Sequence, residues 1–134
     1  MRPRELAFDE IVQLVGIHCH EIDAARLSPA LGGSVVHLPD WVREYGLASS
    51  PWGIWLWTAP SGGHEAAGMG QATLDLPGGR YVVDALDTVT GAWISREVGT
   101  APPLVIGLPR RNGPVLLRIV RQAERRGSSG DPVA

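Results

Sequence analysis

Short apolar runs separated by turn-forming residues make up most of the chain from residue 34 onward. The clearest example lies between Leu74 and Gly91, where two apolar runs flank a Pro-Gly-Gly turn and a second turn starts at Asp87. A change of strand roughly every 8 to 12 residues is typical of antiparallel β-sandwiches. The pattern predicts a mainly β fold, an antiparallel β-sandwich of about seven strands, with strands at residues 34–38, 53–58, 71–76, 80–86, 92–98, 104–108 and 115–121.

The N-terminal part of the chain has a different period. Apolar residues recur at spacings of three, four and five between residues 5 and 27, which predicts an amphipathic helix interrupted near Gly16 and packed on or beside the sandwich. A single helical turn closed by Gly46 is predicted at residues 40–46. The predicted organisation is therefore a helical segment at 1–33, a β-sandwich at 34–124 and a flexible polar tail at 125–134.

Composition narrows the class of protein. A chain of 134 residues with 44% hydrophobic and 19% charged side chains fits one ordinary globular domain. Its net charge of -2 gives no reason to expect a nucleic acid or an anionic membrane as partner. The chain shows neither a secretory signal pattern nor a run of roughly 20 apolar residues, so we expect a soluble protein of open localisation.

The segment His18-Cys19-His20-Glu21 is the first place to look for a metal site. Neighbouring helical positions point about 100° apart, so His18 and His20 cannot easily share one ion. His37 or His64 would have to supply further ligands, and no second pair has metal-ligand spacing. We therefore expect neither a metal nor another cofactor.

A small stand-alone hydrolase is the enzymatic hypothesis, using His64 with Asp84 or Glu97. Catalytic groups are assembled in space, and no nucleophile-elbow motif supports this assignment. Asp84 is predicted on the polar face of its strand, whereas Asp87 is predicted to open a turn that Gly91 closes. We assign no catalytic residue from the sequence, which favours a protein that is not an enzyme.

Tryptophans offer the strongest candidates for ligand binding. In an extended strand Trp55 and Trp57 project to one face while Ile54 and Leu56 project to the other, so this strand is apolar on both sides. The N-terminal helix, a neighbouring domain or a second copy of the chain in a homo-oligomer joined through residues 52–57 would cover the extra face. Alternatively, exposed indole rings would stack on sugar rings, and the candidates are Trp41, Trp52, Trp55 and Trp57.

The segment from Gly79 to Trp93 contains a Gly-x-Tyr strand followed by an Asp-x-x-Thr-Gly turn. With the Pro-containing loop and Leu-rich strand that follow, at residues 103–109 and 114–119, it resembles the C-terminal accessory β-sandwich of glycoside hydrolases. That collagen-binding-type domain follows the catalytic (β/α)8 barrel. Tyr81, Asp87, Thr90 and Gly91 match in order and spacing.

Two positions depart from the family pattern. Thr88 stands where the family usually has proline, and Ala85 stands where it often has an aromatic residue. The family's catalytic acids lie on the barrel and have no counterpart in this chain. The resemblance therefore implies a noncatalytic accessory domain that packs on a glycoside hydrolase barrel or weakly binds carbohydrate.

Overall fold

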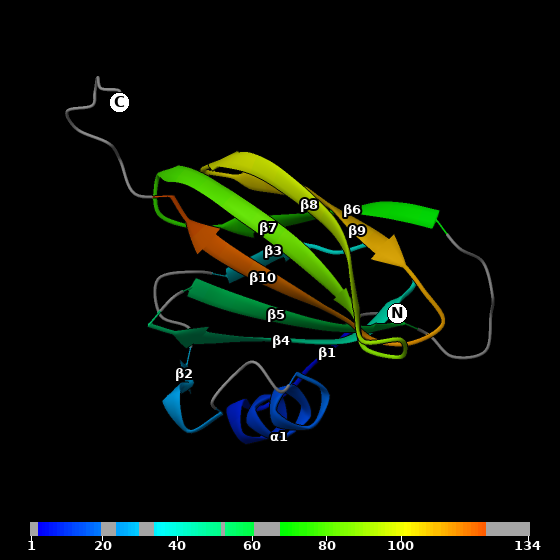
Figure 1. Cartoon of the computed structure of the whole chain (residues 1–134). Coiled ribbons are helices and arrows are strands. Elements are labelled where there is room, and N and C mark those ends of the chain that lie inside the picture. The colour runs from blue at the N-terminus through cyan, green and yellow to red at the C-terminus, as the bar shows by residue number, and fades with distance from the viewer. Residues whose placement is uncertain (1–2, 20–23, 30–33, 52, 61–67, 123–134) are drawn as a thin grey trace.

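The computed structural model describes residues 3–19, 24–29, 34–51, 53–60 and 68–122. Most of them lie in two sheets that face each other (Figure 1). The larger sheet has a central run of antiparallel strands in the order β4 (Val42–Ser50), β5 (Gly53–Pro60), β10 (Val115–Arg121), β7 (Gly79–Asp87) and β8 (Ala92–Ala101). Two short strands, β1 (Arg4–Glu5) and β2 (Ser28–Pro29), both pair with β4. The smaller sheet is β3 (Ser34–His37), β6 (Gly68–Asp75) and β9 (Leu104–Arg110).

The main core lies between the two sheets, because alternate residues of each strand point inward. It is made of buried aliphatic side chains from both sheets, with Tyr81 as the buried aromatic residue among them. The Tyr81 hydroxyl donates a hydrogen bond of 2.7 Å to the carbonyl of Pro77 and so ties the start of β7 to the preceding turn. The largest contributors are Leu56, Leu74, Leu104, Ile106, Leu108, Leu117 and Ile119.

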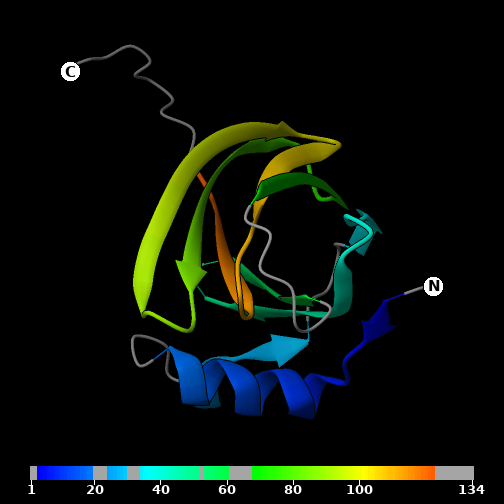
Figure 2. The same ribbon diagram turned by 90° about the vertical axis from the view of Figure 1, so that its right-hand side faces the viewer.

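One edge of the sandwich is closed by β8 and β9, which curve toward each other (Figure 2). A Cβ added to Gly99 of β8 would lie 2.7 Å from the Leu104 side chain, so the two strands approach closely here. The carboxylate of Glu97 accepts a hydrogen bond of 2.8 Å from the backbone N–H of Gly107. A side chain of β8 thus provides a hydrogen-bond acceptor for one backbone N–H at the edge of β9.

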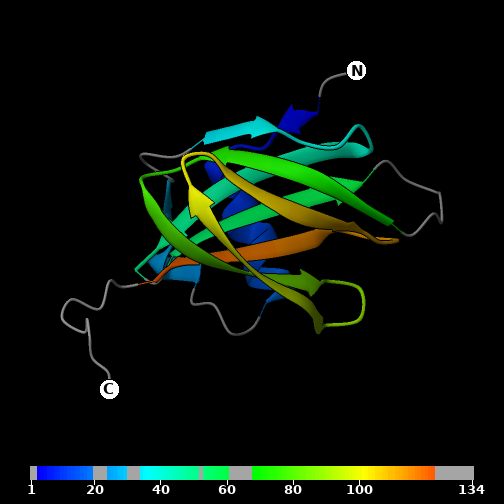
Figure 3. The ribbon, with the colours of Figure 1, turned by 90° about the horizontal axis from the view of Figure 1, so that it is seen from above.

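The opposite edge is open. There β3 is the last strand of the smaller sheet, and its backbone pairs with β6 alone among the described strands. Across the gap lie β4 and the two-residue strand β1, which runs near β3 when the molecule is seen from above (Figure 3). We call this gap the seam.

The helix α1 (Phe8–His18) packs on the outer face of the larger sheet (Figure 2). Its buried residues Ile11 and Val15 form a second core with Trp57 and other side chains of that face. The helix begins after Ala7, whose N–H donates a hydrogen bond of 2.9 Å to the Glu10 carboxylate. This acid also suits the positive end of the helix dipole.

The mainly β prediction is confirmed, and a described strand overlaps each of the seven predicted ranges, although β3 ends at His37 and β6 at Asp75, one residue before the predicted ends. The predicted helix at residues 5–27 is too long, since α1 ends at His18; among the described residues from there to residue 27, a short 3₁₀ helix, η1 (Ala24–Arg26), is the only further helical piece. Gly16 does not interrupt α1. The predicted helical turn at residues 40–46 is wrong, because Val42 begins β4, an edge-region strand with a bulge between Val42 and Glu44.

The segment at 1–33, predicted to be helical, also contributes to the larger sheet through its short strands β1 and β2. The predicted tail at 125–134 lies outside the described residues. Within the described part of the chain, no helix combines the length and apolar composition that crossing a membrane requires.

Candidate functional site

Two of the four candidate tryptophans lie under α1. Trp55 is 5% exposed and Trp57 is 2% exposed, both within the second core. The stacking hypothesis therefore fails for these two residues, because a sugar ring cannot reach a face that a helix covers. Trp41 is half-buried, with the guanidinium of Arg110 5.5 Å from its ring centroid. Trp52 lies outside the described residues.

The candidate acids lie on different faces of the larger sheet. Asp84 points to the outer face, as its alternation in the strand predicts, whereas Glu97 points to the side of β9 and binds the Gly107 N–H. His64 lies outside the described residues. The structure thus does not bring Asp84 and Glu97 into one cleft, which removes the paired arrangement that acid–base chemistry would use.

Asp84 is instead held by two arginines that lie directly opposite it on the neighbouring strands, Arg118 on β10 and Arg96 on β8. Arg96 donates two hydrogen bonds, of 2.7 and 3.2 Å, and Arg118 donates one of 3.0 Å. Arg118 also lies over the ring of Trp93, 4.4 Å from its centroid. The bonds from Arg96, and then the bond from Arg118, outweigh burial and hold the pKa of Asp84 below its ordinary value.

We expect Asp84 to make folding stability depend on pH in the acid range. A lowered folded-state pKa gives a stabilisation that is fully present above the unfolded-state pKa of about 4 and is lost as pH falls through the folded-state pKa. The Asp84→Asn variant should be less stable than wild type at pH 7, and the difference should shrink toward about pH 2. Urea unfolding of both proteins at several pH values measures this. A difference that stays constant with pH would contradict a role for the charge.

Asp87 has a structural role that the sequence predicted correctly. Its carboxylate accepts hydrogen bonds from the N–H groups of Val89 (2.9 Å) and Thr90 (3.3 Å), and Gly91 closes the turn at a φ of 77°. Burial alone would raise the pKa of Asp87, but these bonds and one from Arg111 together lower it. Asp87 is thus a turn-forming residue.

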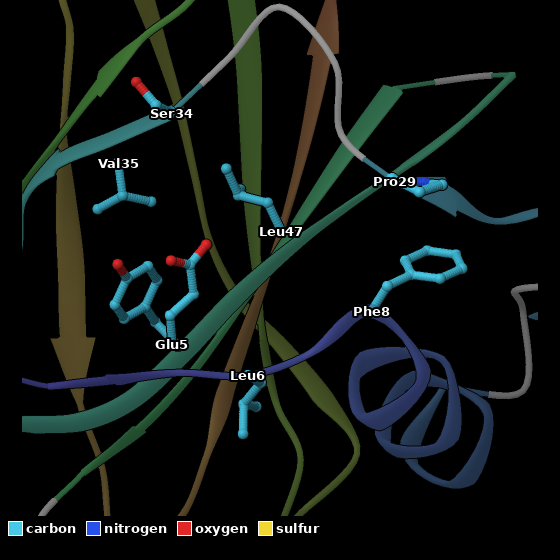
Figure 4. A pocket seen from close by; sticks show the side chains of 8 residues that line it. Glu5, Leu6, Phe8, Pro29, Ser34, Val35 and Leu47 are labelled. Atoms are coloured by element: carbon cyan, nitrogen blue, oxygen red, sulfur yellow. The ribbon is translucent and has the colours of Figure 1, made fainter.

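One hollow lies at the seam. It has a volume of about 300 Å³ and is lined by residues of β1, α1, β2, β3 and β4. Figure 4 shows Phe8 beside Pro29 at one end and Glu5 between Val35 and Leu47 at the other, while the Leu6 side chain points away from these residues. We call this the Phe8 hollow.

A second hollow of about 370 Å³ shares Val35 and Tyr45 with the first. It continues along the seam past Val36, His37 and Leu38, and we call it the His37 hollow. Together they form a two-part depression with Tyr45 as the aromatic residue common to both parts. Hollows of this size fall at the lower end of the range for small-molecule sites.

Polar groups lie among the apolar walls of the seam. Burial, and then the nearby charge of Glu5, raise the pKa of Tyr45. Its hydroxyl is protonated at neutral pH, as that of an ordinary tyrosine is. No described residue forms a hydrogen bond with that hydroxyl. Next to Glu5, Arg4 pairs with Glu44 of β4 at 3.0 Å and with Glu10 of α1 at 3.4 Å, which positions this wall of the seam.

The sequence did not reveal this site. Tyr45 and Leu47 lie two positions apart and share a strand face, but the predicted helical turn hid that alternation. Glu5 and Phe8 were assigned to one long helix, and nothing local shows that β3 lies opposite them.

The structure does not assemble metal ligands among the described residues, since no three His, Cys, Asp or Glu residues of those ranges lie close enough to hold an ion. His20, Glu21 and His64 lie outside those ranges.

No family model, curated protein or solved structure matches the chain. The resemblance to the accessory domain of glycoside hydrolases rests on the motif around Tyr81 and Asp87 and stays a prediction. Within β7, the Tyr81 hydroxyl bonds the turn before the strand, and Asp87 forms the turn after it.

Proposed function

We propose that this protein is a noncatalytic β-sandwich module that binds carbohydrate in the seam. The observation that carries the proposal is the Phe8 hollow, where two half-exposed aromatic residues, Phe8 and Tyr45, line the same space as the polar side chains of Glu5 and Ser34. Sugars present apolar C–H faces and a rim of hydroxyls. Aromatic rings next to hydrogen-bonding groups suit both features.

The hydrogen bonds made by the acidic residues of the sandwich favour a binding function over a catalytic one. Asp84 is paired with two arginines, Asp87 accepts two turn N–H groups, and Glu97 accepts an edge N–H. A general acid needs a raised pKa, whereas the pKa values of Asp84 and Asp87 are lowered. Oligomerisation through the strand at 52–57 is also less favoured, because α1 of the same chain covers Trp55 and Trp57.

The resemblance to glycoside hydrolase accessory domains suggests the protein with which such a module would work. An accessory module of that kind would hold a polysaccharide near a catalytic barrel, which would be its partner. The seam rather than the tryptophan strand would then be the contact with carbohydrate.

Replacing Tyr45 with alanine is expected to weaken carbohydrate binding about tenfold or more, because the change removes both the ring and the hydroxyl from the hollow. Tyr45→Phe should lose only the hydroxyl hydrogen bond, about two- to tenfold. The measurement is calorimetry against gluco-, xylo-, manno- and galacto-oligosaccharides.

Val105→Ala on the outer face of the smaller sheet is the matched control, since Val105 is exposed and belongs to neither hollow. The proposal fails if wild type binds none of these sugars at millimolar concentration. It also fails if Tyr45→Ala binds as well as wild type while remaining folded.

A further inference from the structure

We infer that the seam selects linear oligosaccharides of at least two sugar rings, with one ring in each hollow and Tyr45 between them. The inference rests on the proposed function and specifies its ligand class. It follows from the extent of the depression, whose two adjoining hollows measure about 300 and 370 Å³ and meet at Val35 and Tyr45.

The shared wall explains how two rings would be placed. Val35 and Tyr45 line both hollows, so neighbouring rings of one ligand would touch the same two side chains. Val35 belongs to β3 and Tyr45 to β4, the strands on opposite sides of the seam. A ligand that lies along the seam therefore passes between these two side chains, and this geometry favours an extended ligand.

Each hollow also has its own polar residues. The Phe8 hollow offers the carboxylate of Glu5 and the hydroxyl of Ser34, and the His37 hollow offers the imidazole of His37. Hydroxyl groups of two successive rings would each find hydrogen-bonding partners. A purely apolar chain, such as a lipid tail, would leave these groups without partners at a free-energy cost.

Two residues allow the contribution of each hollow to be tested by itself. Phe8 lines only the first hollow and His37 lines only the second. His37 is exposed, so His37→Ala should leave the fold intact. Phe8 also packs on the second core, so the thermal stability of Phe8→Ala must be measured alongside its affinity.

The test is calorimetry with the mono-, di- and trisaccharide of the gluco-, xylo-, manno- and galacto-series. We expect the best disaccharide to bind wild type about tenfold more tightly than its monosaccharide. Phe8→Ala and His37→Ala should each bring disaccharide affinity close to the monosaccharide level. Val105→Ala should leave the difference unchanged.

Equal affinity for the monosaccharide and the disaccharide would overturn the inference while leaving carbohydrate binding in place. An unchanged disaccharide affinity in His37→Ala would overturn it as well. Failure of every sugar to bind would instead overturn the proposed function itself.

Discussion

Replacing Trp57 with alanine should lower the free energy of unfolding by about 3 to 5 kcal/mol. The indole is 2% exposed and lies between Gly46 of β4 and Leu116 of β10 in the sheet register. Its ring centroid is also 5.3 Å from that of His18 at the end of α1. Alanine would leave a cavity under the helix, and urea unfolding followed by circular dichroism measures the loss.

Trp57→Phe is the control for this experiment. It keeps an aromatic ring in the second core but removes the indole N–H, which is buried without a hydrogen-bond partner among the described residues. Removing such a donor offsets part of the lost packing, so we expect a cost of about 1 kcal/mol. Equal losses for alanine and phenylalanine would contradict the view that ring packing fixes α1 to the sheet.

Replacing Gly46 with alanine should be the next most damaging change, at about 1 to 3 kcal/mol. A Cβ at this position would meet Ile11 of α1, lying 2.6 Å from its Cγ1 and closer still to its Cδ1. Ile11 is fully buried and cannot turn into solvent. The close approach of helix and strand thus depends on the missing side chain, and urea unfolding measures the cost.

Gly68→Ala is the matched control, because a Cβ there meets no atom within 4 Å. It should be neutral or slightly stabilising, since alanine restricts the unfolded chain. Adding Ile11→Ala to Gly46→Ala should cost less than the sum of the two single changes, because the shorter side chain relieves the contact. Additive losses in that double mutant would show that the contact with Ile11 is not the cause.

Much of the fold was visible in the sequence because it depends on local alternation and turn chemistry. β10 was predicted at its observed bounds, and Asp87 and Gly91 marked the turn after β7. β4 was missed because its charged residues, Arg43 and Glu44, fall at the bulge and break the alternation.

The candidate site could not be read in the same way. The sequence showed that the strand of Trp55 and Trp57 needs cover on both faces, but it left open whether helix, partner or sugar supplies it. That choice depends on where α1 packs, which is decided by Ile11 and Val15 against the sheet. The seam depends on which strand edges meet, and residues such as Glu5 and Val35 carry no local sign of being neighbours.

The contact between Glu97 and Gly107 bears on how the protein behaves at high concentration. An unpaired strand edge can add the strand of another molecule, which is how edge-to-edge aggregation begins. At β9 a carboxylate already occupies one backbone N–H, and it brings a negative charge that disfavours an incoming strand. Strand pairing between copies of this protein is thus disfavoured at the edge formed by β8 and β9. Among the described strands of the smaller sheet, β3 is then the edge at which copies would pair more readily.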